Sequence, residues 1–209
     1  MKTIYTTIFF LVGIVAANAA TIVINWSVSA DRTLQGITAT PLSAGTGSPG
    51  NGTFVQLGYY SLATLTNPFS GAWVSLAATT IGDDGVEVPG RFSTSSILGG
   101  VPFSAPSIGT PLAIRFYDGT SVANSLHFNA ASNTNGTWSW VSPSDPAPIM
   151  NLVIDKSIGI VFQSGVVGAY STQLTIPEPS ALVLFSLGLS ILTLNRRRLK
   201  KKNSRTRRY

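Results

Sequence analysis

The chain has 209 residues, of which 44% are hydrophobic and 11% are charged, and its formal net charge at pH 7 is +6. Nine of its 14 Lys and Arg residues lie in residues 196–209. Residues 20–176 hold four basic and seven acidic residues, a net charge of −3, which argues against nucleic-acid binding because phosphate contacts need clustered basic side chains. The chain has no cysteine, which excludes disulfide bonds, thiolate zinc sites and a thiol nucleophile.

Residues 1–19 have the pattern of a secretory signal peptide. Lys2 provides a positive charge, residues 8–15 form an apolar stretch, and Ala17 and Ala19 are the small residues that signal peptidase requires at its cleavage site. The apolar stretch is too short to span a hydrocarbon core of about 30 Å. We therefore predict a signal-peptide helix that signal peptidase removes after Ala19.

Residues 20–176 form one predicted domain made of β-strands. Short apolar segments alternate with turns rich in Gly, Asn and Asp, and no segment shows the period of a helix. Residues 45–52 and 98–110 are predicted to be loops. The predicted strands are residues 21–28, 33–38, 53–60, 72–78, 86–92, 112–117, 121–129, 137–141, 151–154, 159–163 and 169–176.

This succession of strands predicts an all-β fold, namely an antiparallel β-sandwich or a jelly roll. A parallel sheet needs long crossover connections, usually helical, and no segment of the domain is suited to that role. In residues 112–117 every second side chain is large and apolar, and the turn sequence Asp118-Gly119 follows directly. We predict a hairpin between this segment and residues 121–129, with one half-buried face.

His127 is the only histidine of the chain, and it lies in a predicted strand on the face opposite to Leu126 and Phe128. A catalytic triad would need a serine and an acid beside it, and no Gly-x-Ser-x-Gly sequence accompanies it. A metalloenzyme would need more than one imidazole. We therefore predict a solvated strand histidine, no catalytic residue, no metal site and no cofactor.

Asp83, Asp84 and Glu87 are the only cluster of acidic residues. Asp-Asp-Gly is first of all a turn sequence, and its spacing lacks the alternating ligands of a calcium-binding loop. A glycosidase would need a second carboxylate at a defined separation, contributed from elsewhere in the fold. We predict a solvated turn, with a calcium site and a glycosidase carboxylate as the alternatives.

Trp138 and Trp140 are two residues apart in a predicted strand, so both rings project from one face of that strand. Such a pair either packs into the core, together with Trp26 and Trp73, or forms a platform that stacks against sugar rings. We favour the core and keep the carbohydrate platform as the alternative.

Pro177, Glu178 and Pro179 form a rigid acidic tripeptide that ends the predicted domain. The proline rings prevent a regular helix from starting upstream of Ser180, so they keep the chain extended there. An extended backbone is the form in which a protease binds its substrate, and this segment therefore suits a cleavage site.

Residues 180–195 follow as an uncharged, mostly apolar segment, and Arg196, Arg197 and Arg198 begin a basic tail, residues 196–209. The apolar part makes only about 22 Å of helix. The arginines can snorkel to the membrane interface and so compensate for the short length. We predict a transmembrane helix that ends in a basic cytoplasmic tail.

Together, residues 177–209 strongly resemble the PEP-CTERM sorting signal of exopolysaccharide-producing bacteria. The tripeptide matches the recognition motif, the apolar segment matches the membrane segment, and the basic cluster matches the membrane stop. The resemblance implies a protein that is exported across the inner membrane and held there transiently. An exosortase then cleaves it near the tripeptide and delivers it to the cell surface or the extracellular polysaccharide. The resemblance implies no activity for residues 20–176.

We therefore expect an exported surface or matrix protein that is not an enzyme. One alternative is a carbohydrate-binding module for exopolysaccharide, with Trp138 and Trp140 as its platform. The other is a glycoside-acting enzyme on the same sandwich, using Asp83, Asp84 or Glu87. The expected partners are signal peptidase, an exosortase-type protease, the membrane before processing and, in the first alternative, exopolysaccharide.

Overall fold

The computed structural model describes residues 20–45, 51–82, 88–99, 105–144, 146–157, 159–164, 170–172 and 174–175. All regular secondary structure within these ranges is β, which confirms the predicted all-β class. None of the residues so described forms a helix that could cross a membrane. The predicted signal peptide and the predicted sorting signal both lie outside these ranges.

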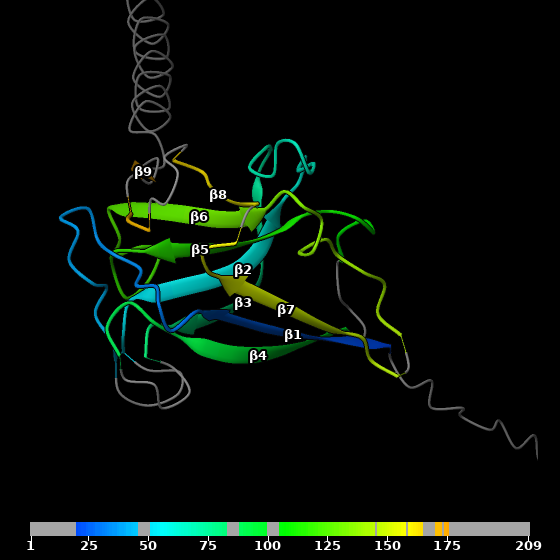
Figure 1. Ribbon diagram of the computed structural model, residues 1–209, viewed down its shortest axis with the longest axis horizontal. Helices are drawn as coiled ribbons and strands as arrows, with labels where there is room; N and C mark the ends of the chain where they lie inside the picture. Colours follow the sequence, from blue (N-terminus) through cyan, green and yellow to red (C-terminus); the bar gives the residue numbers. More distant parts are fainter. Residues whose placement is uncertain are drawn as a thin grey trace, which may run out of the picture.

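The strands form two sheets (Figure 1). A small sheet has the order β4-β1-β7, and a large sheet has the order β3-β2-β5-β6-β8, with the short β9 also paired to β6. The strands are β1 (Thr21–Val28), β2 (Phe54–Tyr60), β3 (Trp73–Thr80), β4 (Ser93–Gly99), β5 (Leu112–Tyr117), β6 (His127–Asn133), β7 (Ile149–Ile154), β8 (Ile160–Phe162) and β9 (Leu174–Thr175).

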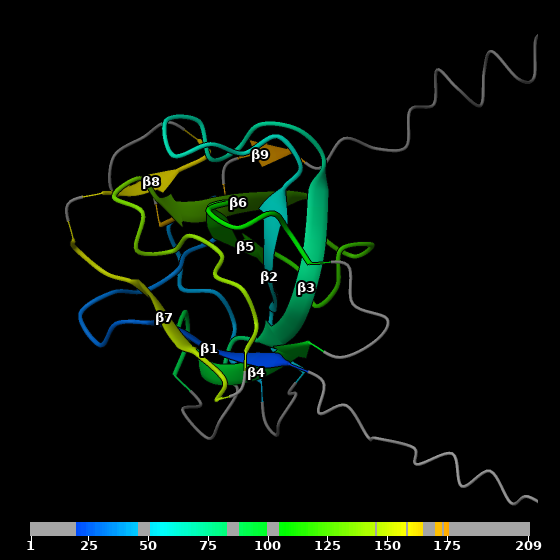
Figure 2. The same cartoon turned by 90° about the vertical axis from the view of Figure 1, so that its right-hand side faces the viewer.

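The two sheets share one hydrophobic core. In β1, side chains alternate strictly between buried and half-buried, and Ile22, Ile24 and Trp26 are at most 1% exposed. These side chains belong to the same buried cluster as Leu57 of β2 and Ile114 of β5, which lie in the large sheet. Figure 2 shows the large sheet curving over the small one, with β3 descending toward β4.

One strand pair departs from the prediction of an antiparallel fold. β1 and β7 run parallel, with Trp26 opposite Leu152, whereas every other pair of described strands is antiparallel. A parallel pair needs a long connection, but that connection need not be a helix. Here residues 29–148, which contain β2 to β6, make the connection.

β4 lies where the sequence does not predict it. We expected a strand at residues 86–92 and a loop from residue 98, but residues 88–92 form no strand and β4 occupies Ser93–Gly99. Its inward-facing residues are Thr94, Ser96 and Leu98, and only Leu98 is large and apolar. The strand therefore lacks the alternating apolar pattern on which the prediction depends.

Two other predicted strands are absent from the sheets. In residues 33–38 only Gln35 forms β-bridges, and in residues 137–141 only Ser139 does so, to the residue before β5. Both segments run across the core as irregular chain. Leu34 of the first segment and Trp138 and Trp140 of the second are buried, which explains why the segments resemble strands in the sequence.

β5 and β6 form the predicted antiparallel hairpin, but its burial differs from the prediction. β5 is the middle strand of the large sheet, and five of its six residues are buried, so both of its faces are covered. β6 begins only at His127, because residues 118–126 form a longer loop than an Asp-Gly turn. Leu126, predicted on the buried face, is 72% exposed in that loop.

Candidate functional site

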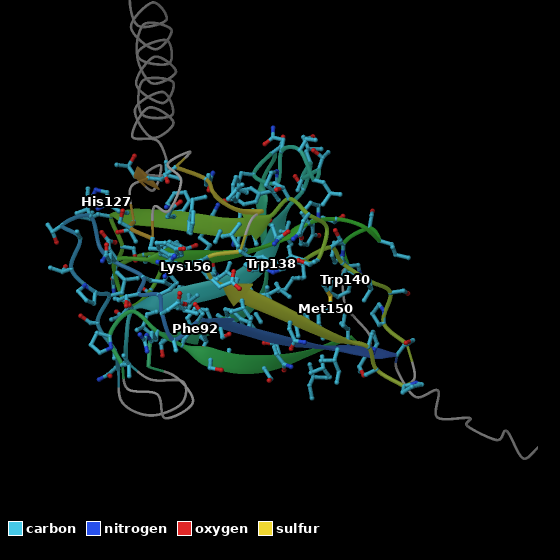
Figure 3. The ribbon with its side chains drawn as sticks, in the orientation of Figure 1. Phe92, His127, Trp138, Trp140, Met150 and Lys156 are labelled. Atoms are coloured by element: carbon cyan, nitrogen blue, oxygen red, sulfur yellow. The ribbon has the colours of Figure 1, made fainter. Side chains whose placement is uncertain are left out.

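Trp138 and Trp140 lie in the core. Their exposed fractions are 3% and 1%, and both belong to the cluster between the two sheets (Figure 3). The chain that carries them runs beside β5, where the Leu112 amide donates to the Trp138 carbonyl over 2.9 Å and the Trp140 amide donates to the Thr110 carbonyl over 2.8 Å. The core interpretation is confirmed, and the alternative of an exposed sugar platform at these residues is wrong.

His127 is paired with a carboxylate that the sequence analysis treated only as part of a turn. Its Nδ1 lies 2.8 Å from Oδ2 of Asp118, and each of the two side chains is 22% exposed. Oδ1 of Asp118 accepts hydrogen bonds from the amides of Leu126 and His127, over 2.9 and 3.0 Å. His127 is thus a strand residue, as predicted, but it is half-buried and hydrogen-bonded to Asp118.

A carboxylate at Nδ1 fixes the orientation of an imidazole and leaves Nε2 available as a base, which is the arrangement of a catalytic dyad. No hydroxyl group of the described residues hydrogen-bonds to His127. The pair thus lacks the nucleophile of a triad and serves here to close the loop between β5 and β6. No sequence pattern predicts the Asp118–His127 pair, because the register of β5 with β6 sets the loop length that brings the two residues together.

A hollow of about 210 Å³ lies beside this pair, between residues 36–43 and Thr53. Asp118 is the charged residue of its lining, and both carboxylate oxygens already accept hydrogen bonds. The hollow therefore presents hydroxyl and backbone groups and no free charge.

The predicted acidic cluster Asp83, Asp84 and Glu87 lies outside the residues that the structure describes. Among those it does describe, no group of three His, Cys, Asp or Glu side chains is close enough to hold a metal ion.

Arg115 occupies an aromatic cluster on the face of the large sheet that points away from the core. Its guanidinium carbon lies 4.5 Å from the ring centre of Trp73, 4.4 Å from that of Phe128 and 5.2 Å from that of Tyr60. One Nη also donates to the Tyr60 hydroxyl over 2.7 Å. These contacts join β2, β3, β5 and β6, so Arg115 stabilises the sheet through cation–π interactions.

Burial raises the pKa of Tyr60 and of Tyr117 in this cluster above the usual value of about 10, while the nearby Arg115 acts in the opposite direction. The unfolded chain therefore releases these two protons at lower pH than the folded chain does. The resulting stabilisation is complete below pH 10 and is lost as the pH rises through the folded-state pKa.

We expect the midpoint of urea unfolding to fall as the pH rises above about 10, and to fall less steeply in Tyr60→Phe, which has no ionisable hydroxyl at that position. The measurement is a series of urea titrations between neutral and strongly alkaline pH. Equal slopes for the two proteins would contradict the assignment of this effect to Tyr60.

A pocket with a volume of about 370 Å³ lies where β1 and β7 end. A turn after β1 carries Arg32, whose amide donates to the Ser29 carbonyl. The turn after β7 carries Lys156 (Figure 3) and is closed by the Ser157 amide, which donates to Oδ1 of Asp155 over 2.8 Å. The lining residues are Arg32, Asp155, Lys156, Ser157, Ile160, Phe162 and Tyr170.

The charged groups of the pocket differ in how far they are paired. Nζ of Lys156 lies 3.3 Å from Oδ2 of Asp31, and this pair is largely exposed and so weak. The pKa of Asp31 is lowered, mainly by the hydrogen bond from Ser29 and secondly by Lys156. The guanidinium of Arg32 lies 4.9 Å from the ring centre of Tyr170, and its Nε is buried with no hydrogen-bond partner.

Basic residues gather at this end of the molecule. Arg32, Arg91 and Lys156 are three of the four Lys and Arg residues that the structure describes, and Nε of Arg91 donates to the Arg32 carbonyl over 3.1 Å. Burial raises the pKa of Tyr170, against the effect of Arg32, and its hydroxyl donates to the Asp155 carbonyl over 3.0 Å. No sequence pattern predicts this pocket, because its residues come from four separate segments.

Comparison of the chain with protein-family models, with curated proteins and with solved structures finds no match. The pocket at Arg32 is therefore interpreted from its own geometry.

Proposed function

We propose that the chain is an exported cell-surface or extracellular-matrix protein without enzymatic activity, sorted through the PEP-CTERM-like signal in residues 177–209. The observation that carries the proposal is where the domain lies relative to the two signals. β1 begins at Thr21, directly after the predicted mature N-terminus Ala20, and β9 ends at Thr175, shortly before the tripeptide. Cleavage at both predicted sites would leave every described strand in the released protein.

The fold we propose for the released domain is a β-sandwich. Two sheets with a common core support it. The parallel pairing of β1 with β7 favours a sandwich over a jelly roll, which consists of antiparallel Greek keys. Such a fold needs no cofactor, and the absence of cysteine makes its stability independent of the redox state of the compartment.

The proposed route passes through signal peptidase, the inner membrane and an exosortase-type protease. The basic tail stays on the cytoplasmic side, as the bias of basic residues toward that side requires, and residues 180–195 hold the precursor in the membrane. Of the two alternatives, exopolysaccharide binding can no longer rest on Trp138 and Trp140, since both are buried. The residues named for a glycoside-acting enzyme, Asp83, Asp84 and Glu87, lie outside the described ranges.

The test replaces Glu178, the acidic residue between the two prolines. If an exosortase recognises the tripeptide, Glu178→Ala in a bacterium that carries the matching enzyme is expected to stop release. The precursor, with its basic tail, should accumulate in the inner membrane. The measurement is an immunoblot of membrane and medium fractions, combined with N-terminal sequencing, which should give Ala20 for both proteins because translocation is unaffected.

Glu87→Ala is the matched control, because Glu87 is the only other glutamate of the chain and lies within the exported domain. It should be released at the wild-type rate. Release of Glu178→Ala at that same rate would show that the tripeptide is only a linker, and the sorting proposal would then have to be withdrawn.

A further inference from the structure

The Arg32 pocket combines a cation, a carboxylate and an apolar wall in one space. The guanidinium of Arg32 makes no hydrogen bond to any described residue, and its central carbon lies 4.9 Å from the ring centre of Tyr170. Oδ1 of Asp155 accepts from the Ser157 amide, and its Oδ2 has no hydrogen-bond partner among the described residues. Ile160 and Phe162 supply the apolar part of the lining.

Each of these groups specifies part of a ligand. A guanidinium is planar and suits a carboxylate, which accepts two parallel hydrogen bonds from it. The free Oδ2 of Asp155 can accept a hydrogen bond from a ligand hydroxyl group, whereas it would repel an anionic group of the ligand. The hydroxyl of Ser157 can donate or accept, and the apolar wall suits C–H groups.

We propose that this pocket binds one unit of an acidic saccharide, with the sugar carboxylate at Arg32 and sugar hydroxyls at Asp155 and Ser157. A volume of about 370 Å³ lies within the usual range for small-molecule sites. The inference goes beyond the proposed function, because it depends on neither export nor processing.

The charges of the pocket favour this ligand over other anions. Lys156 also lines the pocket and lies 3.3 Å from Asp31, so the charged groups of the lining are the cations Arg32 and Lys156 and the carboxylate Asp155. A compact dianion such as sulfate would bring its charge close to Asp155 and leave that carboxylate without a donor. A neutral sugar would satisfy Asp155 and leave the guanidinium without an anion. A hydroxy acid satisfies both groups.

The experiment is isothermal titration calorimetry of the full chain, purified in detergent, with D-galacturonate, D-galactose and sulfate as the probes. We expect galacturonate to bind about tenfold or more tightly than galactose, because only galacturonate makes the charged hydrogen bond to Arg32. Sulfate should bind no better than galactose. Arg32→Gln should reduce galacturonate binding to the level of galactose, while Arg115→Gln, an equal change of charge in the cluster on the far face of the large sheet, should leave it unchanged.

Asp155→Asn provides a test that loss of folding cannot imitate. It keeps the Oδ1 acceptor for the Ser157 amide and removes the negative charge, so galacturonate should bind several-fold more tightly while galactose changes little. Equal affinity for galacturonate and galactose, or unchanged galacturonate binding in Arg32→Gln, would overturn the proposal. Sulfate that matches galacturonate would reduce the pocket to a general anion site and overturn the assignment of a saccharide.

Discussion

Replacing Trp140 by alanine is expected to lower the free energy of unfolding by about 3–5 kcal/mol. The indole is 1% exposed and packs in the cluster that joins the two sheets. Its removal leaves a cavity that regular sheets on both sides cannot close without moving their strands. Trp138→Ala, at 3% exposure in the same cluster, should behave alike. The measurement is the urea midpoint of each variant with an unchanged m-value.

Ile97→Ala is the control, because Ile97 is equally apolar but 73% exposed on the outer face of the small sheet. Its effect should stay within about 0.5 kcal/mol. A Trp140→Ala protein as stable as the wild type would contradict the core assignment. If either tryptophan variant binds polysaccharide less well than the wild type, its loss of stability has to be measured before the weaker binding is attributed to a lost binding surface.

Part of this fold follows from local sequence pattern. β1 is predicted with its full extent because Ile22, Ile24 and Trp26 alternate with residues that stay half-buried. β5 is also predicted with its full extent, although it is buried on both faces, since its large apolar residues still alternate with smaller or polar ones. A strong periodicity of two residues therefore sufficed to predict both strands, whether one face is buried or two.

Other parts depend on long-range contacts that no local pattern encodes. β4 is a strand because β1 pairs with it along its whole length, and its own sequence is rich in serine. The Asp118–His127 pair depends on the register of β5 with β6. The Arg32 pocket requires the parallel pairing of β1 and β7, which brings the turns after both strands to the same end of the small sheet.

Gly58→Ala is expected to destabilise the protein by about 3 kcal/mol or more. Gly58 lies at an irregularity of β2, where the register with β3 shifts. A Cβ at this position would come within 2.3 Å of the Val74 carbonyl oxygen and 2.7 Å of the Trp73 ring. The first contact is with backbone, so the new methyl group must push β3 away from β2. The second displaces the ring that packs against Arg115.

Gly36→Ala separates this steric effect from the loss of a glycine as such. The nearest atoms to a Cβ at Gly36 are 3.8 Å away and its φ is not in the left-handed region, so alanine fits there. Its effect should be a gain of about 0.4–1 kcal/mol, because alanine reduces the entropy of the unfolded chain. Urea titrations of the two variants should therefore shift in opposite directions. If the urea midpoints of both variants shift in the same direction, the close approach of β3 to Gly58 does not decide the stability of the sheet. The aromatic cluster around Arg115 would then have to tolerate a displaced Trp73.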